Sequence, residues 1–305
     1  MYGSASTATQ TSFVIPIPST EYGASHYIDL NQCASLLNRK LIKQQALVPV
    51  QVSLDCGTGA DHTSLTTGSK MIWGVEALPN TYVTRKSWLL AKGAFLEATK
   101  EERAMIKTAR WNDFKVHYDR THLSKGFAAN LLPDMVRYDG FTALQTTGWE
   151  ASQIADREST NEFFYGFFGS TDAVYFGMYQ QYEISMEASQ ASPDPIVAQA
   201  DIPYSDIMSQ IDPEDAAVLQ AINETPPYDP QGLQINPQKY HVGWQNASGA
   251  MTPVSYVEST TPFFIAPSGL LKITNESGDG LTHVGSIRIN LMAGNDRGLE
   301  LGGYK

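Results

Sequence analysis

The segment Glu162–Ile184 reads EFFYGFFGSTDAVYFGMYQQYEI and lies just past the middle of a 305-residue chain. It holds nine aromatic residues: Phe163, Phe164, Tyr165, Phe167, Phe168, Tyr175, Phe176, Tyr179 and Tyr182. Aromatic side chains favour strands, and each of them buries a large apolar area. The turn residues GSTD at 169–172 interrupt the run. The pattern therefore predicts two strands joined in a tight hairpin.

Further strand patterns lie on both sides of this segment, where apolar and polar residues alternate between turn residues. Before it, the predicted strands are Phe13–Ile17, Tyr27–Cys33, Leu47–Leu54, Met71–Leu78, Asp113–Tyr118, Tyr138–Thr146 and Trp149–Ala155. After it, they are Tyr240–Trp244, Val254–Val257, Phe263–Ile265, Leu270–Thr274 and Ser286–Met292. The number of strands predicts an all-β protein.

Two segments have helical patterns instead. Between Lys86 and Arg110, apolar residues recur at spacings of three and four. At Pro213–Ile222, Asp212 stands at the N-cap position and Pro213 at the first helical position. Each half of the chain thus reads strands, one helix, strands. We predict two β-sandwiches with one helix inserted in each, over residues 1–157 and 158–305.

Charge is unevenly distributed along the chain. Residues 1–125 carry fourteen Lys and Arg against ten acids, a net charge of +4, whereas the remaining residues carry −15. The whole chain has a net charge of −11, and its first twenty residues contain no Lys or Arg. Proteins that package nucleic acid directly usually present a basic patch or arm. We therefore expect no strong direct binding to nucleic acid.

The two cysteines, Cys33 and Cys56, do not form a CxxC motif. One disulfide or two buried free thiols fit the sequence, and the free thiols are favoured. No run approaches the roughly 20 apolar residues of a membrane span. The N-terminal residues MYGSASTATQTSF lack the features of a signal peptide, and we interpret them as a Ser/Thr-rich arm.

The densest polar cluster is HYDRTH, which contains His117, Asp119 and His122. A strand would place His117 and Asp119 on one face and leave His122 in the next loop, so a solvated strand end is favoured over a metal or catalytic site. The sequence contains no HExxH, GxSxG, GxxxxGK[ST] or GxGxxG motif. We expect no catalytic, cofactor-binding or metal-binding residue.

A calcium site is the other metal site considered. Asp55, Asp61 and His62 lie near a Gly-rich turn. Calcium bound there would need several further oxygen ligands, so a plain loop is favoured.

Several phrases resemble capsid proteins of small circular single-stranded DNA viruses. YIDLNQCASLLNRK (Tyr27–Lys40) is similar to their opening strand and LxNR motif, and INLMAGNDRGLE (Ile289–Glu300) to their last strand and PGxxRG turn, with Ala293 in place of proline. Other similar phrases are LPNTYVTRKSW (Leu78–Trp88), DFKVHYD (Asp113–Asp119), GWEASQI (Gly148–Ile154), SPDP (Ser192–Pro195), AVLQAINETPPYD (Ala217–Asp229) and APSGLLKI (Ala266–Ile273).

Among these viruses, the chain most resembles the double jelly-roll major capsid proteins of tailless, lipid-containing icosahedral bacteriophages, the finnlakevirus-like group. The resemblance implies a non-enzymatic virion protein, made in the host cytoplasm, that self-assembles as pseudo-hexameric trimers into an icosahedral shell over an internal membrane. The implied partners are other copies of the chain, penton and minor capsid proteins, and the lipid membrane. The absence of a basic arm favours this branch over single jelly-roll capsids that bind the genome.

On this interpretation the important residues lie between subunits. The nine aromatics of Glu162–Ile184 exceed what one sandwich face buries, so we expect part of them at an interface. The two helices either lie near the base of the subunit or cover sheet edges. Arg297 with Gly298 either contacts a neighbouring carboxylate or, as favoured, is solvated. We expect the N-terminal arm and the tail LELGGYK to be ordered only by neighbouring subunits.

The competing class is a carbohydrate-binding or glycan-hydrolysing β-sandwich. It requires exposed aromatic residues beside paired carboxylates. The aromatic segment would then be a platform on which sugars stack. Strand aromatics more often lie in a core or a subunit interface, which favours the capsid interpretation.

Overall fold

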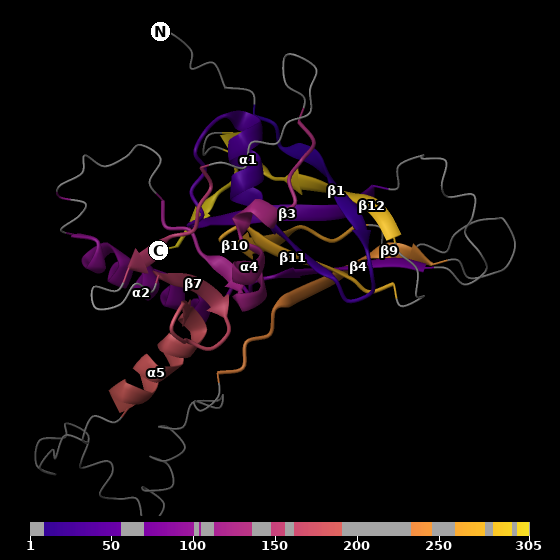
Figure 1. Cartoon of the computed structure of the whole chain (residues 1–305). Coiled ribbons are helices and arrows are strands. Elements are labelled where there is room, and N and C mark those ends of the chain that lie inside the picture. Colours follow the sequence, from indigo (N-terminus) through magenta and orange to yellow (C-terminus); the bar gives the residue numbers. More distant parts are fainter. Residues whose placement is uncertain are drawn as a thin grey trace, which may run out of the picture.

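The computed structural model describes residues 9–55, 70–100, 104, 113–135, 148–155, 162–190, 233–245, 260–277, 283–294 and 298–304. Antiparallel strands make up most of its regular structure (Figure 1). The prediction of a mainly β protein is therefore confirmed. The predicted strands Tyr138–Thr146 and Val254–Val257 and the predicted helix Pro213–Ile222 lie outside the described residues.

The sandwich consists of two sheets, one of five strands and one of four, and the fifth strand of the first sheet is the two-residue β15 (Gly302–Gly303). The first sheet has the order β1 (Ser12–Thr20), β12 (His283–Leu291), β3 (Ala46–Asp55) and β10 (Phe264–Pro267). The second has the order β2 (Ser25–Asp29), β11 (Leu270–Asn275), β4 (Lys70–Ala77) and β9 (Gln238–Gln245). Seven of the predicted strands, Phe13–Ile17, Leu47–Leu54, Met71–Leu78, Tyr240–Trp244, Phe263–Ile265, Leu270–Thr274 and Ser286–Met292, coincide with strands of these sheets.

The pairing of these strands is nested. Strand β1 pairs with β12, β2 with β11, β3 with β10, and β4 with β9, all antiparallel. The chain is thus a long folded-back ribbon, and successive parts of the ribbon lie in alternate sheets. The pairings of β12 with β3 and of β11 with β4 complete the two sheets. This is the strand order of a jelly roll.

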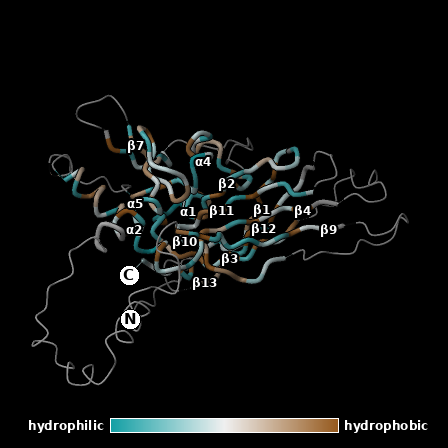
Figure 2. Tube along the Cα trace, turned by 90° about the horizontal axis from the view of Figure 1, so that it is seen from below, coloured by the Kyte–Doolittle hydropathy of each residue, from teal (hydrophilic) through white to brown (hydrophobic). Residues whose placement is uncertain are grey.

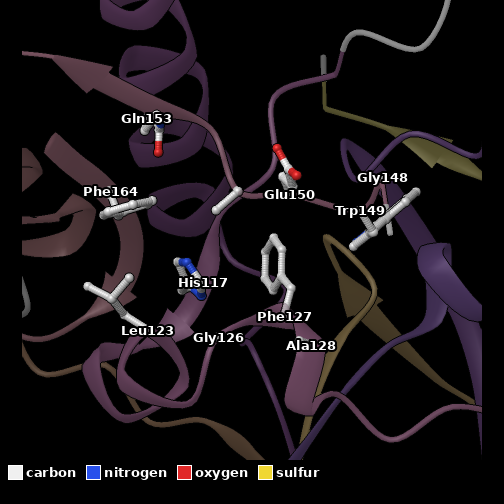
Figure 3. A pocket seen from close by; sticks show the side chains of 11 residues that line it. His117, Leu123, Gly126, Phe127, Ala128, Gly148, Trp149, Glu150, Gln153 and Phe164 are labelled. Atoms are coloured by element: carbon white, nitrogen blue, oxygen red, sulfur yellow. The ribbon is translucent and has the colours of Figure 1, made fainter. Parts of the chain in front are cut away.

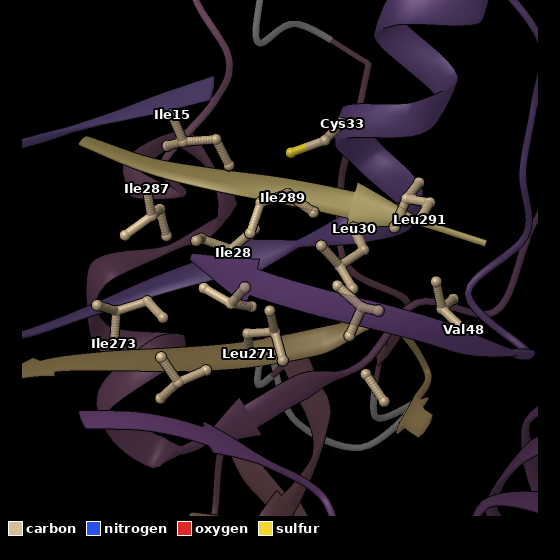
Figure 4. Packing of buried hydrophobic residues seen from close by; sticks show 14 of the residues in the cluster. Ile15, Ile28, Leu30, Cys33, Val48, Leu271, Ile273, Ile287, Ile289 and Leu291 are labelled. Carbon is tan, nitrogen blue, oxygen red and sulfur yellow. The ribbon is translucent and has the colours of Figure 1, made fainter. Parts of the chain in front are cut away.

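The core of the sandwich follows from period-two alternation of buried and exposed residues along the strands. Figure 2 shows brown, hydrophobic parts mixed with teal, hydrophilic parts along the strands of the sandwich. In β1, Phe13, Ile15 and Ile17 are buried while the residues between them are less so. Side chains from both sheets meet in one cluster (Figure 4), including Ile28, Val48, Leu271, Ile273, Ile287 and Ile289. Each fully buried aliphatic side chain contributes about 1.5–3 kcal/mol, so this cluster holds the sheets together.

The expected division into two sandwiches, residues 1–157 and 158–305, is not what the described strands show. Strands from both ranges alternate within each sheet, and β1 pairs with β12 over most of its length. The described strands of the first and last parts of the chain therefore form one sandwich. Repetition of strands, helix, strands along a sequence does not reveal which strands pair, because the pairing partners are far apart in the chain.

A short helix follows the second strand. The prediction of a strand over Tyr27–Cys33 is correct only to Asp29, after which α1 (Leu30–Asn38) begins. The Asp29 carboxylate caps this helix and accepts hydrogen bonds from the amides of Asn31 (2.9 Å) and Gln32 (3.2 Å). The alternating pattern hid this capping position.

The turn between β10 and β11 locks α1 against the sandwich. Ser268 and Gly269 both have positive φ angles, +57° and +65°, as in a two-residue hairpin turn. Asn31 donates its side-chain amide to the Ser268 carbonyl at 2.7 Å. A β-carbon at position 269 would overlap the Asn31 side chain, so only glycine fits here.

The described parts of residues 78–237, between β4 and β9, form an insertion at one end of the sandwich (Figure 1). Its described elements are α2 (Tyr82–Ala98), β5 (His117–Asp119), α4 (Arg120–Lys125), the 3-10 helix η2 (Phe127–Ala129), β6 (Gln153–Ala155), β7 (Glu162–Phe168), β8 (Tyr175–Gly177) and α5 (Met178–Gln190). The predicted strands Asp113–Tyr118 and Trp149–Ala155 contribute only β5 and β6. The predicted helix Lys86–Arg110 is confirmed from Lys86 to Ala98 as part of α2, which starts earlier, with Thr81 as its N-cap, whereas residues 101–103 and 105–110 lie outside the described part.

The hairpin predicted within Glu162–Ile184 is wrong. Strand β8 pairs with β7 in parallel, and the chain then continues as α5. The GSTD turn explains the path, because Asp172 Oδ1 accepts from the Tyr175 amide (3.0 Å) and Thr171 Oγ1 accepts from the Gly177 amide (3.0 Å). Tyr179 and Tyr182 are three residues apart on α5, a helical spacing that the density of aromatics concealed.

The C-terminal tail belongs to the fold, contrary to the expectation that neighbours would order it. Leu299 is buried, and β15 (Gly302–Gly303) pairs with β3. The Tyr304 ring lies 4.8 Å from the Trp88 ring of α2, and its hydroxyl bonds to Ser268 Oγ at 2.9 Å. The two-residue strands β13 (Ala293–Gly294) and β14 (Gly298–Leu299) pair just before it. Residues 1–8 and Arg297 lie outside the described part.

Candidate functional site

A buried carboxylate joins the insertion to the sandwich. Asp29 Oδ2 accepts from Trp149 Nε1 at 2.8 Å and from Gln44 Nε2 at 3.2 Å. Gln44 in turn holds Val116 through both backbone groups, accepting from its amide at 2.6 Å and donating to its carbonyl at 3.0 Å. Burial raises the pKa of Asp29 to about 6, and its hydrogen bonds oppose that rise.

The HYDRTH cluster forms a second connection. Asp119 caps α4 by accepting from the His122 amide (2.8 Å), and the same oxygen accepts from the Tyr27 hydroxyl of β2 (2.7 Å). Its other oxygen pairs with Lys272 Nζ of β11 at 3.3 Å. The His122 ring lies flat on the Tyr27 ring, with 4.4 Å between their centres. The cluster therefore fixes the insertion to the second sheet.

His122 is fully hydrogen-bonded. Its Nδ1 accepts from the Tyr118 amide at 3.0 Å, which leaves the proton on Nε2 to bond Asn130 Oδ1 at 2.8 Å. Asn130 continues to Gln32 Oε1 at 2.9 Å. Burial lowers the pKa of His122 to about 4. His122 is thus a neutral structural residue, and the expected solvated strand end is wrong because both histidines of the cluster are buried.

His117 differs from His122. Its ring is 2% exposed, and neither Nδ1 nor Nε2 has a hydrogen-bond partner within the described part of the chain. Burial, followed by the nearby His122, lowers its pKa to about 3. A buried polar group without a partner is costly, and such groups call for a functional explanation.

A cleft of about 680 Å³ opens beside His117 (Figure 3). We call it the His117 cleft. It is lined by His117, Leu123, Gly126, Phe127, Ala128, Gly148, Trp149, Glu150, Ala151, Gln153 and Phe164. The volume and the mainly apolar and aromatic lining, with a few polar groups, are typical of small-molecule sites.

The walls of the His117 cleft are aromatic and its rim is polar. The Phe127 ring centre lies 4.5 Å from that of His117, and the Phe164 ring stands edge-on at 6.2 Å. Trp149 is held from one side by Lys115 Nζ, 4.8 Å from its ring centre, and by its bond to Asp29. Glu150 and Gln153 are exposed. This arrangement suits binding rather than acid–base catalysis, because the imidazole stays neutral and lies deep in the cleft.

The nine aromatics of Glu162–Ile184 are divided between core and partly exposed positions. Tyr165, Phe167, Tyr175 and Tyr179 are buried and the other five are partly exposed. The Tyr175 hydroxyl donates to the Phe168 carbonyl at 2.5 Å, and its ring crosses Gly166, where a β-carbon would overlap it. The close approach explains the glycine within FFYGFF. None of the nine rings is among the exposed large apolar side chains of the described residues.

A second, smaller hollow of about 240 Å³ lies between α2 and α5, and we call it the helix groove. Leu90 lines it and is 55% exposed, and Phe176 forms part of its wall. The remaining lining residues are Ser87, Ala91, Ala94, Met178, Gln181, Tyr182 and Ser185. Ile184 of α5 is a further exposed apolar residue. Exposed apolar surface of this kind is typical of protein contacts.

The cysteines and the residues of the possible calcium site are only partly described. Cys33 is a buried free thiol whose pKa is raised by burial, and Cys56 lies outside the described residues. Asp61 and His62 also lie outside them, and the Asp55 side chain is not described. Within the described ranges, no group of three His, Cys, Asp or Glu side chains is placed to hold a metal ion.

The sequence pointed to His117 but not to its surroundings. Phe127, Trp149 and Glu150 come from segments with no recognisable motif, and only the fold brings them together. GWE at 148–150, an aromatic residue beside an acid after a glycine, was the available signal, and it is weak.

Comparison with protein-family models, with curated proteins and with solved structures finds no match to this chain. Among the described helices, none is both long enough and apolar enough to span a membrane.

Proposed function

We propose that this chain is a viral capsid protein that assembles with copies of itself into a closed icosahedral shell. The jelly-roll order of the eight longer sandwich strands carries the proposal. Jelly rolls occur in viral capsids, lectins and cupins. In the described strands the space between the sheets is filled by apolar side chains such as Ile28 and Ile289, which suits a rigid building block. The phrases that resemble single-stranded DNA virus capsid proteins support the same conclusion.

The single sandwich changes the expected geometry of the shell. The prediction of pseudo-hexameric trimers assumed two sandwiches per chain. The described strands instead make one sandwich with an insertion at its end. We therefore retain closed cyclic association of identical chains without the six-sided outline. Penton and minor capsid proteins, an internal membrane, location in the virion and the absence of enzymatic activity remain part of the proposal.

The helix groove is the surface we assign to contacts between copies. It combines the exposed Leu90 with the partly exposed Phe176, and both lie on the insertion, away from the sandwich core. The buried connection at Asp29 and the partly buried one at Asp119 hold the insertion to the sandwich. An insertion held in this way would let a contact at the groove fix the angle between neighbouring subunits.

The charge of the chain fits a shell that does not bind the genome directly. Its net charge is −11, with the excess of acids in residues 126–305. Nucleic-acid binding through phosphate neutralisation requires clustered Lys and Arg. The proposal thus includes no strong direct binding to nucleic acid.

A carbohydrate-binding sandwich is the second candidate function. The His117 cleft favours it, because aromatic walls and a polar rim are combined in one depression. A glycosidase is less well supported, since Glu150 is the only carboxylate among the described residues that line the cleft and glycoside hydrolysis usually requires two.

Light scattering of the purified protein after size exclusion tests self-assembly. We expect closed oligomers or particles from the unaltered chain and smaller species from Leu90→Glu, which places a charge in the helix groove. Leu90→Met is the matched control, because it keeps the position apolar, and it should assemble normally. A monomer at every concentration, or identical assembly of Leu90→Glu and Leu90→Met, would contradict the proposed contact.

A further inference from the structure

We infer that the His117 cleft binds a neutral sugar ring, with the His117 imidazole at its floor as the main hydrogen-bonding group. The inference rests on the geometry of the cleft and does not require shell assembly. Its first support is that His117 lines a depression of about 680 Å³ with both ring nitrogens unpartnered among the described residues. A depression of this size holds a small ligand.

The imidazole selects for hydroxyl groups. A neutral imidazole has one nitrogen that donates and one that accepts. A hydroxyl group both donates and accepts, so adjacent hydroxyls on one ring satisfy either tautomer of His117. His122, at 4.9 Å between ring centres, stands edge-on to His117, and its own nitrogens are already engaged by Tyr118 and Asn130. His122 therefore does not compete for the His117 nitrogens.

The aromatic walls supply the complementary apolar surface. Phe127, Phe164 and Trp149 line the cleft from three different segments of the insertion. The faces of a sugar ring carry C–H groups, which pack on aromatic rings while the hydroxyls point outward to polar partners. Leu123 and Ala151 extend the apolar lining. A ligand with apolar faces and a polar edge fits this distribution.

The charges around the cleft favour a neutral ligand. Glu150 lies at the exposed rim and repels anions such as phosphate. Lys115 lies behind Trp149, with its Nζ 4.8 Å from the ring centre, and disfavours a cation on that side. Gln153, the other polar rim residue, both donates and accepts hydrogen bonds. Carboxylate and amide groups at the rim are suitable acceptors and donors for sugar hydroxyls.

Saturation-transfer NMR on the full chain tests the inference. The probes are the methyl glycosides of glucose, galactose, mannose and N-acetylglucosamine, with the four deoxynucleosides as competing flat ligands. We expect saturation transfer to at least one glycoside. Gln153→Ala, which changes only an exposed rim residue, should weaken its binding about five-fold, the effect of losing one neutral hydrogen bond. Glu162→Gln, an exposed substitution outside the cleft lining, should leave binding unchanged.

His117→Phe removes both ring nitrogens while keeping a planar ring, and it should abolish glycoside binding in a protein whose circular dichroism is unchanged. The inference is overturned if no glycoside receives saturation. It is also overturned if binding is equal in the unaltered chain, Gln153→Ala and His117→Phe, or if the nucleosides bind in place of the sugars.

Discussion

Trp149 Nε1 donates a 2.8 Å hydrogen bond to Asp29 Oδ2 across the boundary between the insertion and the sandwich. Asp29 ends β2 and caps α1, so a single buried carboxylate terminates a strand, starts a helix and holds the insertion. Trp149 also lines the His117 cleft. The position of this cleft wall therefore depends on a residue of the sandwich.

The first prediction concerns the pH dependence of this connection. Asp29 has a folded-state pKa of about 6, raised by burial above the ordinary aspartate value of 3.8. Because the folded pKa is raised, the folded state binds the proton more tightly, and the contribution of Asp29 to stability is full below pH 3.8 and is lost as pH rises through 6. We expect the unfolding free energy of the unaltered chain, minus that of Asp29→Asn, to fall by about 2.4 kcal/mol between pH 4 and pH 7. Denaturant titrations at several pH values measure this difference, and a constant or rising difference would exclude a raised pKa.

The two buried histidines should respond oppositely to replacement by phenylalanine. His117→Phe removes two buried polar atoms that have no hydrogen-bond partner among the described residues and should stabilise the fold by about 1 kcal/mol. His122→Phe removes the hydrogen bonds to Tyr118 and Asn130 and leaves their buried polar groups without that partner. This change should destabilise the fold by about 2–4 kcal/mol. Chemical denaturation of both variants provides the comparison. Equal destabilisation would show that His117 is as well satisfied as His122.

Adjacent aromatics of β8 should separate folding from assembly. Tyr175 is fully buried, with its hydroxyl bonded to the Phe168 carbonyl, so Tyr175→Ala should cost about 3–5 kcal/mol. Phe176 is only partly buried and lines the helix groove, so Phe176→Ala should weaken assembly with a smaller loss of stability. Denaturation and sizing of the two variants decide between core and interface. If Phe176→Ala assembles normally, the groove is not a contact.

The C-terminal tyrosine should stabilise the isolated subunit. Tyr304 packs on Trp88 and bonds to Ser268, so Tyr304→Ala should lower the unfolding free energy by about 1–3 kcal/mol. Tyr22 is 65% exposed, and Tyr22→Ala is the control, with an expected change within about 0.5 kcal/mol. Both are measured under conditions in which the chain is monomeric. Equal effects of Tyr304→Ala and Tyr22→Ala would show that the packing of Tyr304 does not stabilise the subunit.

The sequence predicted local structure better than pairing. Strands such as β3 and β12 were predictable because one face of each is buried. Burial of one face makes apolar and polar residues alternate along the sequence. Their arrangement was not predictable, because β12 lies next to β3 and β1 through contacts more than 200 residues apart in the chain. The hairpin at Glu162–Ile184 failed for a related reason, since side-chain caps from Thr171 and Asp172 redirected the chain.

The candidate site was visible only in part. His117 was singled out, yet its deep burial and unpartnered nitrogens depend on Phe127 and Phe164, which reach it from other elements. Asp29 gave no functional signal, because the alternating pattern of Tyr27–Cys33 predicted a continuous strand through the position where Asp29 caps α1. Sequence patterns report which face of an element is apolar. They do not report which polar side chains meet when three elements converge.

Electron cryomicroscopy of the purified, concentrated protein tests the proposed shell most directly. Closed particles with icosahedral symmetry are predicted, with one sandwich per chain and the helix groove, including Leu90 and Phe176, buried between neighbouring subunits. Isolated monomers at all concentrations, or regular particles in which the groove faces solvent, would contradict the account.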